Sequence, residues 1–402
     1  MDYKVWIVTI VLLFMTSGCS TKEERAEVKE CGNSFVVSDT ENIFLFEYDT
    51  DTSRIVKRME YKPKETFNQA AYSCELQKII IAYSFRGISR SIGGLEVVDM
   101  NKKSYHKNIK DSPSNFVSHK NGLLIETELF HAELPAKELG DIPDIRESDG
   151  KEIFIYTHYI TLEDIDNGTF SPTKSYRIRP RLGEGTHVYG NHLYGSRDGH
   201  LYKVDLKTGK RELYSDFTTT FNLFLEGDEG SFYVPKVKEK PIVCEHGEHG
   251  DFNESQMPKE WQKSAKIWNS MDDNALYRFH KDSKNGQWKH DKYTDLPDGI
   301  RFKMVVGDDI YFFTNNKKVL KINPVTGAKA QYPFEFSNTF SSINYIENHF
   351  VVLVPKKNGT SVYIIKKDFS KMSAPFHIDY FATHVGGIST HLNYHEHAAL
   401  SE

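Results

Sequence analysis

The stretch LYKVDLKTGKREL, from Leu201 to Leu213, decides the fold that the sequence predicts. Apolar and polar residues alternate up to Asp205, the turn Lys207-Thr208-Gly209 follows, and a second short run leaves that turn. Side chains on a β-strand point alternately to its two faces, and Gly accepts the positive φ of a tight turn. The pattern therefore predicts a β-hairpin.

Similar hairpins recur along the chain, including a degraded copy, YITLEDIDNGTF, near Asp164. The turns are marked by Asp49, Asp99, Asp164, Asp205, His280, Asn323 and Lys367, at spacings of 50, 65, 41, 75, 43 and 44 residues. A period in the forties with four short strands per unit is typical of β-propeller blades. We therefore expect an all-β protein whose residues 31–390 form a seven-bladed β-propeller of four-stranded blades.

The last two units divide most clearly into four strands each. The sixth has Arg301–Val306, Ile310–Thr314, Val319–Asn323 and Ala328–Pro333, and the seventh has Ile343–Ile346, Phe350–Val354, Val362–Lys366 and Pro375–Ile378. The first unit starts at Ser34 with what corresponds to a second strand, whereas Thr383–Ser389 is a spare strand-like run. We expect this C-terminal run to supply the missing inner strand and close the ring, which removes exposed sheet edges.

Two units carry long insertions between their second and third strands, at His131–Glu152 and Pro235–Asp273. Equivalent connections emerge on the same face of a propeller, so both insertions are expected there. Within the second insertion, Ser255–Met271 is the one segment with a helical pattern, because Trp261, Ala265 and Trp268 fall on one face. These tryptophans can pack against the core or form an exposed docking site, and the sequence does not decide between the two.

Composition excludes one class of partner. The net charge is −5 and the pI is about 6.4, whereas a nucleic-acid-binding protein needs a basic face. Aromatic residues make up 13% of the chain, which suits a β-sheet core.

The N-terminus resembles a bacterial lipoprotein signal. Lys4 precedes an apolar run, Val5–Met15, which is too short to span a bilayer, and Thr16-Ser17-Gly18-Cys19 stands in the place of the lipobox, with Thr16 where Leu is usual. The resemblance implies cleavage after residue 18 and a diacylglyceryl thioether and acyl chains (palmitate) on Cys19. Each buried CH₂ of such chains contributes about 0.8 kcal/mol to membrane binding. Residues 19–30 are then a tether and residues 391–402 a tail, and Ser20 suggests the outer membrane, facing the periplasm, in a Gram-negative host.

Three cysteines remain for an oxidising envelope. Cys31 precedes the second strand of the first blade and Cys74 ends the first strand of the second blade, so both are expected at neighbouring turns on one face. A Cα separation of about 4.4–6.8 Å is needed for a disulfide. We expect Cys31 to pair with Cys74 and Cys244 to remain a thiol.

One cluster contains metal-ligand residue types. Cys244, His246, His249 and Asp251 lie within eight residues of the second insertion and suit Zn²⁺ or a copper ion. The spacing matches no established metal motif, and a flexible polar loop explains the residues equally well. His391, His395 and His397 form a second patch, with a disordered tail as the alternative. No cofactor is otherwise expected.

A second group comes from aligned repeats. His187 and His384 occupy the same place in the inner strands of the fourth and first blades, and inner strands line the central channel. They can act as ligands or as acid and base, although shared repeat ancestry also explains the match. Arg177, Arg179 and Arg181 precede the fourth blade on the insertion-bearing face, where they can bind a carboxylate or phosphate or form ion pairs between blades.

The hairpins at Asp205 and Asn323, with their Thr-Gly turns, resemble the repeats of quinoprotein-like and YVTN-type propellers. The sequence has none of the Gly-x-Ser-x-Gly, Walker, Gly-x-Gly-x-x-Gly or His-Glu-x-x-His motifs, which favours a binding module over an enzyme. The first hypothesis is a lipid-anchored propeller that binds an envelope protein or a small ligand. The alternatives are a propeller hydrolase or lyase, and a metal-binding sensor.

Overall fold

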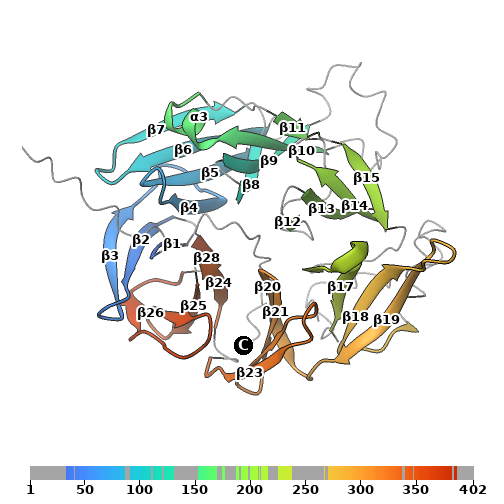
Figure 1. Cartoon of the computed structure of the whole chain (residues 1–402). Coiled ribbons are helices and arrows are strands. Elements are labelled where there is room, and N and C mark those ends of the chain that lie inside the picture. The colour runs from blue at the N-terminus through green and yellow to red at the C-terminus, as the bar shows by residue number, and fades with distance from the viewer. Residues whose placement is uncertain are drawn as a thin grey trace, which may run out of the picture. The chain divides into compact units, whose positions relative to one another are not determined.

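The described residues of the computed structural model form seven four-stranded antiparallel sheets (Figure 1). The structure describes residues 33–39, 41–86, 91–109, 112–119, 122–130, 153–169, 174–176, 187–189, 192–197, 200–206, 208, 210–215, 225–237, 267, 270–336, 340–346, 348–382 and 384–386. They belong to one compact unit, Asn33–Glu402, and Met1–Gly32 is a separate unit. The expected signal, tether and C-terminal tail lie outside the described residues.

Six sheets consist of four strands that are consecutive in the chain, and one sheet joins its two ends. In sheet order, the first sheet is β28 (His384–Gly386), β1 (Ser34–Ser38), β2 (Ile43–Asp49) and β3 (Arg54–Tyr61); the second is β4 (Gln69–Ser73), β5 (Lys78–Arg86), β6 (Ser91–Asp99) and β7 (Ser104–Ile109); the third is β8 (Ser112–His119), β9 (Gly122–Phe130), β10 (Ile153–Thr161) and β11 (Lys174–Tyr176); the fourth is β12 (His187–Tyr189), β13 (His192–Arg197), β14 (His200–Asp205) and β15 (Arg211–Ser215); the fifth is β16 (Leu225–Glu226), β17 (Phe232–Lys236), β18 (Ala275–Lys281) and β19 (Trp288–Asp295); the sixth is β20 (Ile300–Val306), β21 (Asp309–Thr314), β22 (Lys318–Ile322) and β23 (Lys329–Pro333); the seventh is β24 (Ser342–Ile346), β25 (His349–Lys356), β26 (Gly359–Lys366) and β27 (Phe376–Ile378). Repeated four-stranded antiparallel units of this kind build β-propellers. The predicted all-β fold of the propeller type is confirmed.

The hairpins between third and fourth strands share one device, which explains why Asp or Asn recurs at the turn. The side-chain oxygen of the residue that starts the turn accepts a hydrogen bond from a backbone N–H two or three residues later. The acceptors are Asp49, Asp99, Asp205, Asp282 and Asn323, at 2.7–3.2 Å. Such Asx turns are the reason that short carboxylate and amide side chains favour these positions. In the copy near His280 the acceptor is Asp282, two residues further on.

The degraded repeat near Asp164 does not form a hairpin turn, so that prediction was wrong. A short helix, α3 (Leu162–Asp166), connects β10 and β11 instead. The Thr161 side chain caps this helix by accepting a hydrogen bond from the Asp164 backbone N–H at 3.0 Å, and its hydroxyl donates to the Asp164 carboxylate at 2.7 Å. Ile165 and Leu162 are buried against the second and third sheets.

Hydrophobic clusters fill the space between consecutive sheets, because most strands are apolar on both faces. In β5, for example, Ile79 packs toward the first sheet and Ile80 toward the third. Representative pairs of residues that share such a cluster are Leu45 and Ile79, Ile80 and Leu123, Tyr194 and Phe232, Leu276 and Ile310, Phe313 and Phe350, and Leu353 and Phe46. They join the sheets in the pairs one–two, two–three, four–five, five–six, six–seven and seven–one.

The first strands of neighbouring sheets are also linked by side-chain amides. The Gln69 amide donates to the Phe116 carbonyl oxygen at 3.0 Å and accepts from the Phe116 N–H at 2.7 Å. The Asn344 amide donates to the Val385 carbonyl oxygen at 2.8 Å. A strand at the side of a sheet has backbone groups without a ladder partner, and these amides satisfy three of them on β8 and β28.

Both long insertions lie between a second and a third strand, as the sequence predicts. The first connects β9 to β10, and the second connects β17 to β18. The second insertion begins later than expected, because Pro235 and Lys236 still belong to β17. Pro has no N–H to donate, and among the described residues β16 pairs with β17 only at Phe232 and Tyr233, so no described ladder bond is lost at Pro235. Most of the expected helix Ser255–Met271 lies outside the described residues, although Ile267 and Ser270 have helical backbone geometry.

Candidate functional site

The two ends of the sheets carry different connections. In each sheet, the loop between the second and third strands lies at one end of the strands. The segment that leads from the fourth strand to the next sheet leaves from that same end. We call this end the insertion edge, because the segments 131–152 and 237–274 belong to it. The hairpin edge is the other end, where first-to-second and third-to-fourth turns lie. Loops on a rigid scaffold are where binding residues concentrate, so the insertion edge is the candidate site.

The stem of the second insertion is fixed by a buried ammonium group. Lys236 is 7% exposed, and its Nζ donates to the Met271 carbonyl oxygen at 2.5 Å and pairs with Asp273 Oδ1 at 3.2 Å. Burying a charge is costly unless it is paired and hydrogen-bonded. Lys236 therefore ties the strand that enters the insertion to the segment that leaves it.

Two further residues hold the outgoing segment. The Tyr277 hydroxyl donates to the Asp272 carbonyl oxygen at 3.2 Å, and Lys292 Nζ pairs with Asp272 Oδ2 at 3.2 Å and with Asp295 Oδ1 at 2.5 Å. Burial raises the pKa of Tyr277, whereas hydrogen bonds to Asp295 and then to Asp272 raise the pKa of Lys292. The phenol stays neutral and the ammonium stays charged near neutral pH, which preserves these contacts.

Each of the predicted histidines begins an inner strand, although the two strands pair with their neighbours in different registers. His187 is the first residue of β12 and lies opposite Tyr194, while His384 is the first residue of β28 and lies opposite Ser38. Both strands begin at the insertion edge. The predicted Arg177, Arg179 and Arg181 fall in the connection between β11 and β12, which enters the same edge, and they lie outside the described residues.

The predicted metal ligands Cys244, His246, His249 and Asp251 also lie outside the described residues, as do Cys19, Cys31 and the terminal histidines. Within the ranges that the structure describes, no three His, Cys, Asp or Glu side chains are grouped closely enough to hold a metal ion. Among the same residues, no helix is long and apolar enough to cross a membrane.

Cys74 is disulfide-bonded. It lies in the turn between β4 and β5, at the hairpin edge, where its carbonyl oxygen accepts a hydrogen bond from the Gln77 N–H at 3.2 Å. Its expected partner, Cys31, lies outside the described residues. The pairing of these two cysteines stays a prediction.

Sequence analysis missed two charged clusters between sheets. Between the fourth and fifth sheets, the Tyr194 hydroxyl donates to Glu226 Oε2 at 2.5 Å, and Lys203 Nζ pairs with Glu226 Oε1 at 3.2 Å. Between the sixth and seventh, the buried Asp309 of β21 pairs with Lys321 of β22 at 2.8 Å, and Lys367 of the seventh unit lies 3.9 Å from the same carboxylate. No periodic pattern signals such clusters, because their members come from different units.

The buried tyrosine of the sixth sheet differs from its counterpart in the fourth. Tyr311 pairs with Lys321 across the strands as Tyr194 pairs with Lys203. The Tyr311 hydroxyl is buried and has no hydrogen-bond partner among the described residues. Burial, and then the nearby Asp309 carboxylate, raises the pKa of Tyr311 well above its ordinary value.

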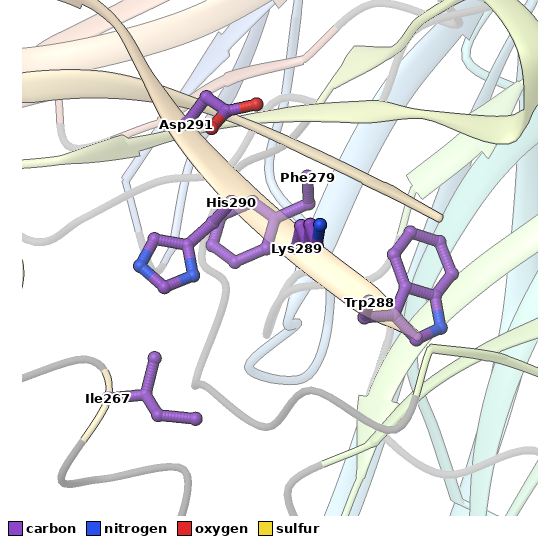
Figure 2. A pocket seen from close by; sticks show the side chains of 6 residues that line it. All are labelled: Ile267, Phe279, Trp288, Lys289, His290 and Asp291. Atoms are coloured by element: carbon purple, nitrogen blue, oxygen red, sulfur yellow. The ribbon is translucent and has the colours of Figure 1, made fainter. Parts of the chain in front are cut away.

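A pocket of about 270 Å³ lies on the outer part of the fifth sheet (Figure 2). Its wall consists of Ile267, Phe279, Trp288, Lys289, His290 and Asp291. This pocket was not predicted from the sequence either, because Ile267 and Phe279 come close to residues 288–291 only in the folded chain. Ile267 comes from the second insertion and lies opposite His290 in Figure 2.

Comparisons with known proteins identify no relative. No protein family matches the sequence, and no curated protein matches it. Among similar solved structures, the periplasmic gluconolactonase PpgL of Pseudomonas aeruginosa is 9% identical, with 88% of this chain and 98% of that chain covered and a TM-score of 0.46. AztD of Citrobacter koseri is 10% identical, with 88% and 96% covered and a TM-score of 0.42. The dihydro-heme d1 dehydrogenase NirN is 10% identical, with 88% and 74% covered and a TM-score of 0.45. These are β-propeller proteins, and similarity at this level carries no activity over to this chain.

Proposed function

We propose that the protein is a cell-envelope binding module: a seven-bladed β-propeller that binds a protein or ligand through its insertion edge. Cys19 is its proposed lipid anchor, and the outer membrane facing the periplasm is its proposed location. The ring form is supported by the six sheet–sheet clusters, which run from the fourth sheet through the seventh and first to the third. The pairing of β28 with β1 supports closure, with Val37 opposite Val385.

The observation that carries the binding proposal is the stem of the second insertion. A loop that only connects two strands needs no buried charge at its base. Here the desolvated ammonium group of Lys236 donates to the Met271 carbonyl oxygen and pairs with the Asp273 carboxylate of the returning chain. The result is an insertion that starts and returns at fixed points of a rigid sheet. Preorganising a loop in this way reduces the entropy lost on binding.

Deletion of each insertion tests the proposal. The full-length lipidated chain is cross-linked in its host, isolated with its partners and compared with variants that replace residues 132–151 or 240–266 by short Gly-Ser linkers. Lys284→Glu, at the hairpin edge, is the control. We expect one specific partner with the wild type and the control, and its loss from at least one folded deletion variant. Equal recovery with both deletions would overturn the proposal.

Two other functions depend on the same edge. A hydrolase or lyase would use His187, His384 and the arginines 177, 179 and 181. A metal sensor would use the ligands at 244, 246, 249 and 251 within the insertion that Lys236 anchors. Metal analysis and titration of residues 20–402, purified without a His tag, separates the sensor from the other two: it requires one Zn²⁺ or copper ion per chain that is lost in His246→Ala.

A further inference from the structure

A tyrosine–lysine pair between the sixth and seventh sheets repeats one that holds a carboxylate between the fourth and fifth. There, Glu226 accepts a hydrogen bond from the Tyr194 hydroxyl at 2.5 Å and pairs with Lys203 Nζ at 3.2 Å. Tyr311 and Lys321 lie opposite each other on β21 and β22, as Tyr194 and Lys203 do on β13 and β14. In both pairs the ammonium group lies over the tyrosine ring, at 5.1 Å in the fourth sheet and 5.9 Å in the sixth.

The second pair lacks the carboxylate. Glu226 lies opposite Phe232 between the first two strands of its sheet, and Tyr345 lies opposite Phe350 in the same way. Both phenylalanines pack toward the preceding sheet, so Tyr345 occupies the position that corresponds to Glu226. The Tyr311 hydroxyl is fully covered and has no hydrogen-bond partner among the described residues. A buried donor without an acceptor is costly, and an added acceptor would remove that cost.

One buried carboxylate faces two ammonium groups at this place. Lys321 Nζ lies 2.8 Å and Lys367 Nζ 3.9 Å from the same oxygen of Asp309, and neither lysine pairs with another carboxylate among the described residues. The other Asp309 oxygen accepts from the Asn323 amide at 3.2 Å. The carboxylates of the adjoining turns are exposed and therefore screened by solvent, namely Asp308 and Asp368. The buried part of the cluster thus has one positive charge in excess.

Phe369 covers the Tyr311 hydroxyl's surroundings from the third-to-fourth turn of the seventh sheet. Its ring centroid is 6.4 Å from that of Tyr311 and 5.3 Å from that of Phe350. Its φ is +58°, which is unusual for a bulky residue. The other described turns of this kind with a positive φ have no aromatic residue there: Ser53, Lys102, Gly286 and Gly327. Strained residues of this kind concentrate at ligand-binding and switch sites.

We propose that a small carboxylic acid, in its ionised form, binds between the sixth and seventh sheets. One carboxylate oxygen accepts from the Tyr311 hydroxyl, and the other pairs with Lys321 and Lys367. The Phe369 ring moves aside to admit the ligand. One negative charge matches the one excess ammonium group, whereas a phosphate group carries about −1.5 to −2 at pH 7. The site lies at the hairpin edge, so it does not depend on the function proposed for the insertion edge.

The test uses residues 20–402, which contain the compact unit with every described sheet. Tyrosine is labelled with ¹³C at the ring carbon that carries the hydroxyl, and the resonance that disappears in Tyr311→Phe reports on the site. Acetate and acetamide are matched probes, because they have nearly the same shape and differ in charge. At constant ionic strength we expect a saturable shift of the Tyr311 resonance with acetate, at a Kd on the order of 1 mM for so small a ligand, and none with acetamide.

Variants separate the contributions of the charge, the covering ring and the empty acceptor position. Lys367→Gln should weaken acetate binding about fivefold, the effect of one partly screened charge, whereas Lys371→Gln, just after the same turn, should leave it unchanged. Phe369→Gly should tighten binding, because it removes the covering ring and Gly takes a positive φ without strain. Tyr345→Glu, which places a carboxylate at the position that corresponds to Glu226, should abolish it.

Three results would overturn the proposal: no shift with acetate even in Phe369→Gly, equal shifts with acetate and acetamide, or full binding by Lys367→Gln. Tighter binding of phosphate than of acetate would overturn the assignment to a carboxylate.

Discussion

Replacement of Lys236 by Met should loosen the stem of the second insertion without unfolding the sheets. Met keeps the apolar part of the side chain but removes the ammonium group that bonds Met271 and Asp273. A hydrogen bond from a charged group contributes about 1.5–3 kcal/mol, and a buried carbonyl left without a donor costs a similar amount. Asp273 is half exposed, so water replaces most of its lost interaction, and its share is small.

The local free energy of opening at the stem should therefore fall by about 2–3 kcal/mol. Since about 1.4 kcal/mol corresponds to a factor of ten, amide hydrogen exchange of the peptide covering residues 271–276 should become roughly 30- to 140-fold faster. Peptides from the sixth and seventh sheets should change less than twofold. Hydrogen exchange followed by mass spectrometry measures both in one experiment.

Lys292→Met is the matched control, because Lys292 contacts the same segment through Asp272 but is more exposed. Amide exchange of the stem peptide in Lys292→Met should stay within about twofold of the wild-type rate, because solvent-screened ion pairs contribute little to stability. Stem exchange in Lys236→Met within twofold of the wild type would refute the assignment. An equal effect of both substitutions would show that the burial of Lys236 is irrelevant.

Three further outcomes follow from the packing. In urea unfolding at pH 7, Tyr194→Phe should lower the free energy of unfolding by about 1–2 kcal/mol, because it removes the hydrogen bond to Glu226. Tyr311→Phe removes a buried hydroxyl that has no partner among the described residues, so it should leave the stability unchanged or raise it. Equal losses of stability in the two variants would contradict this. Because burial keeps Tyr311 protonated in the folded chain while the unfolded chain ionises near pH 10, stability should fall above that pH, and less steeply in Tyr311→Phe. Gly359→Ala should lower the free energy of unfolding by roughly 3 kcal/mol or more, since φ is +135° and the new Cβ would lie 2.0 Å from a carbonyl oxygen of β27. Gly307→Ala, at φ +61° with open space around it, should lower it by about 1 kcal/mol. Similar losses of stability in both variants would contradict this.

Local sequence patterns predicted much of the fold. All strand bounds of the sixth unit lie within one residue of those expected, because alternating apolar residues and an Asx turn are both local signals. The spare C-terminal run Thr383–Ser389 contains β28, which pairs with β1. Repeat alignment also places His187 and His384 at equivalent strand starts, since it depends only on position within a unit.

The helix at Asp164 was missed although its signal is local. Thr161 followed three residues later by Asp164 is a capping pattern, and in the structure the Thr161 hydroxyl accepts from the Asp164 N–H and donates to the Asp164 carboxylate. The segment also aligns with the hairpin repeat, and that alignment predicts a turn in place of the helix. The helix also fits its surroundings, because the Tyr105 hydroxyl donates to the Ile165 carbonyl oxygen at 2.9 Å and Lys78 pairs with Asp166.

The stem of the second insertion and the stacked Phe232 and Phe279 rings of the fifth sheet could not be predicted from the sequence, for a different reason. Lys236 meets Met271 and Asp273 only after the insertion returns, 35 residues later for the first contact. The ring stacking needs the register that places Phe232 opposite Phe279, which is set by strand pairing and not by either local pattern. Interactions of this range depend on the tertiary structure, and one sequence contains no direct record of them.

Photo-cross-linking in the host cell tests the central claim, that the insertion edge is the binding face. A photoreactive amino acid replaces one exposed lysine at a time: Lys62 or Lys317 at the insertion edge, and Lys102 or Lys284 at the hairpin edge. We predict a discrete adduct from at least one insertion-edge position, lost when residues 240–266 are deleted, and none from the hairpin edge. A discrete adduct from the hairpin edge alone, or one that persists after both insertions are removed, would contradict the claim.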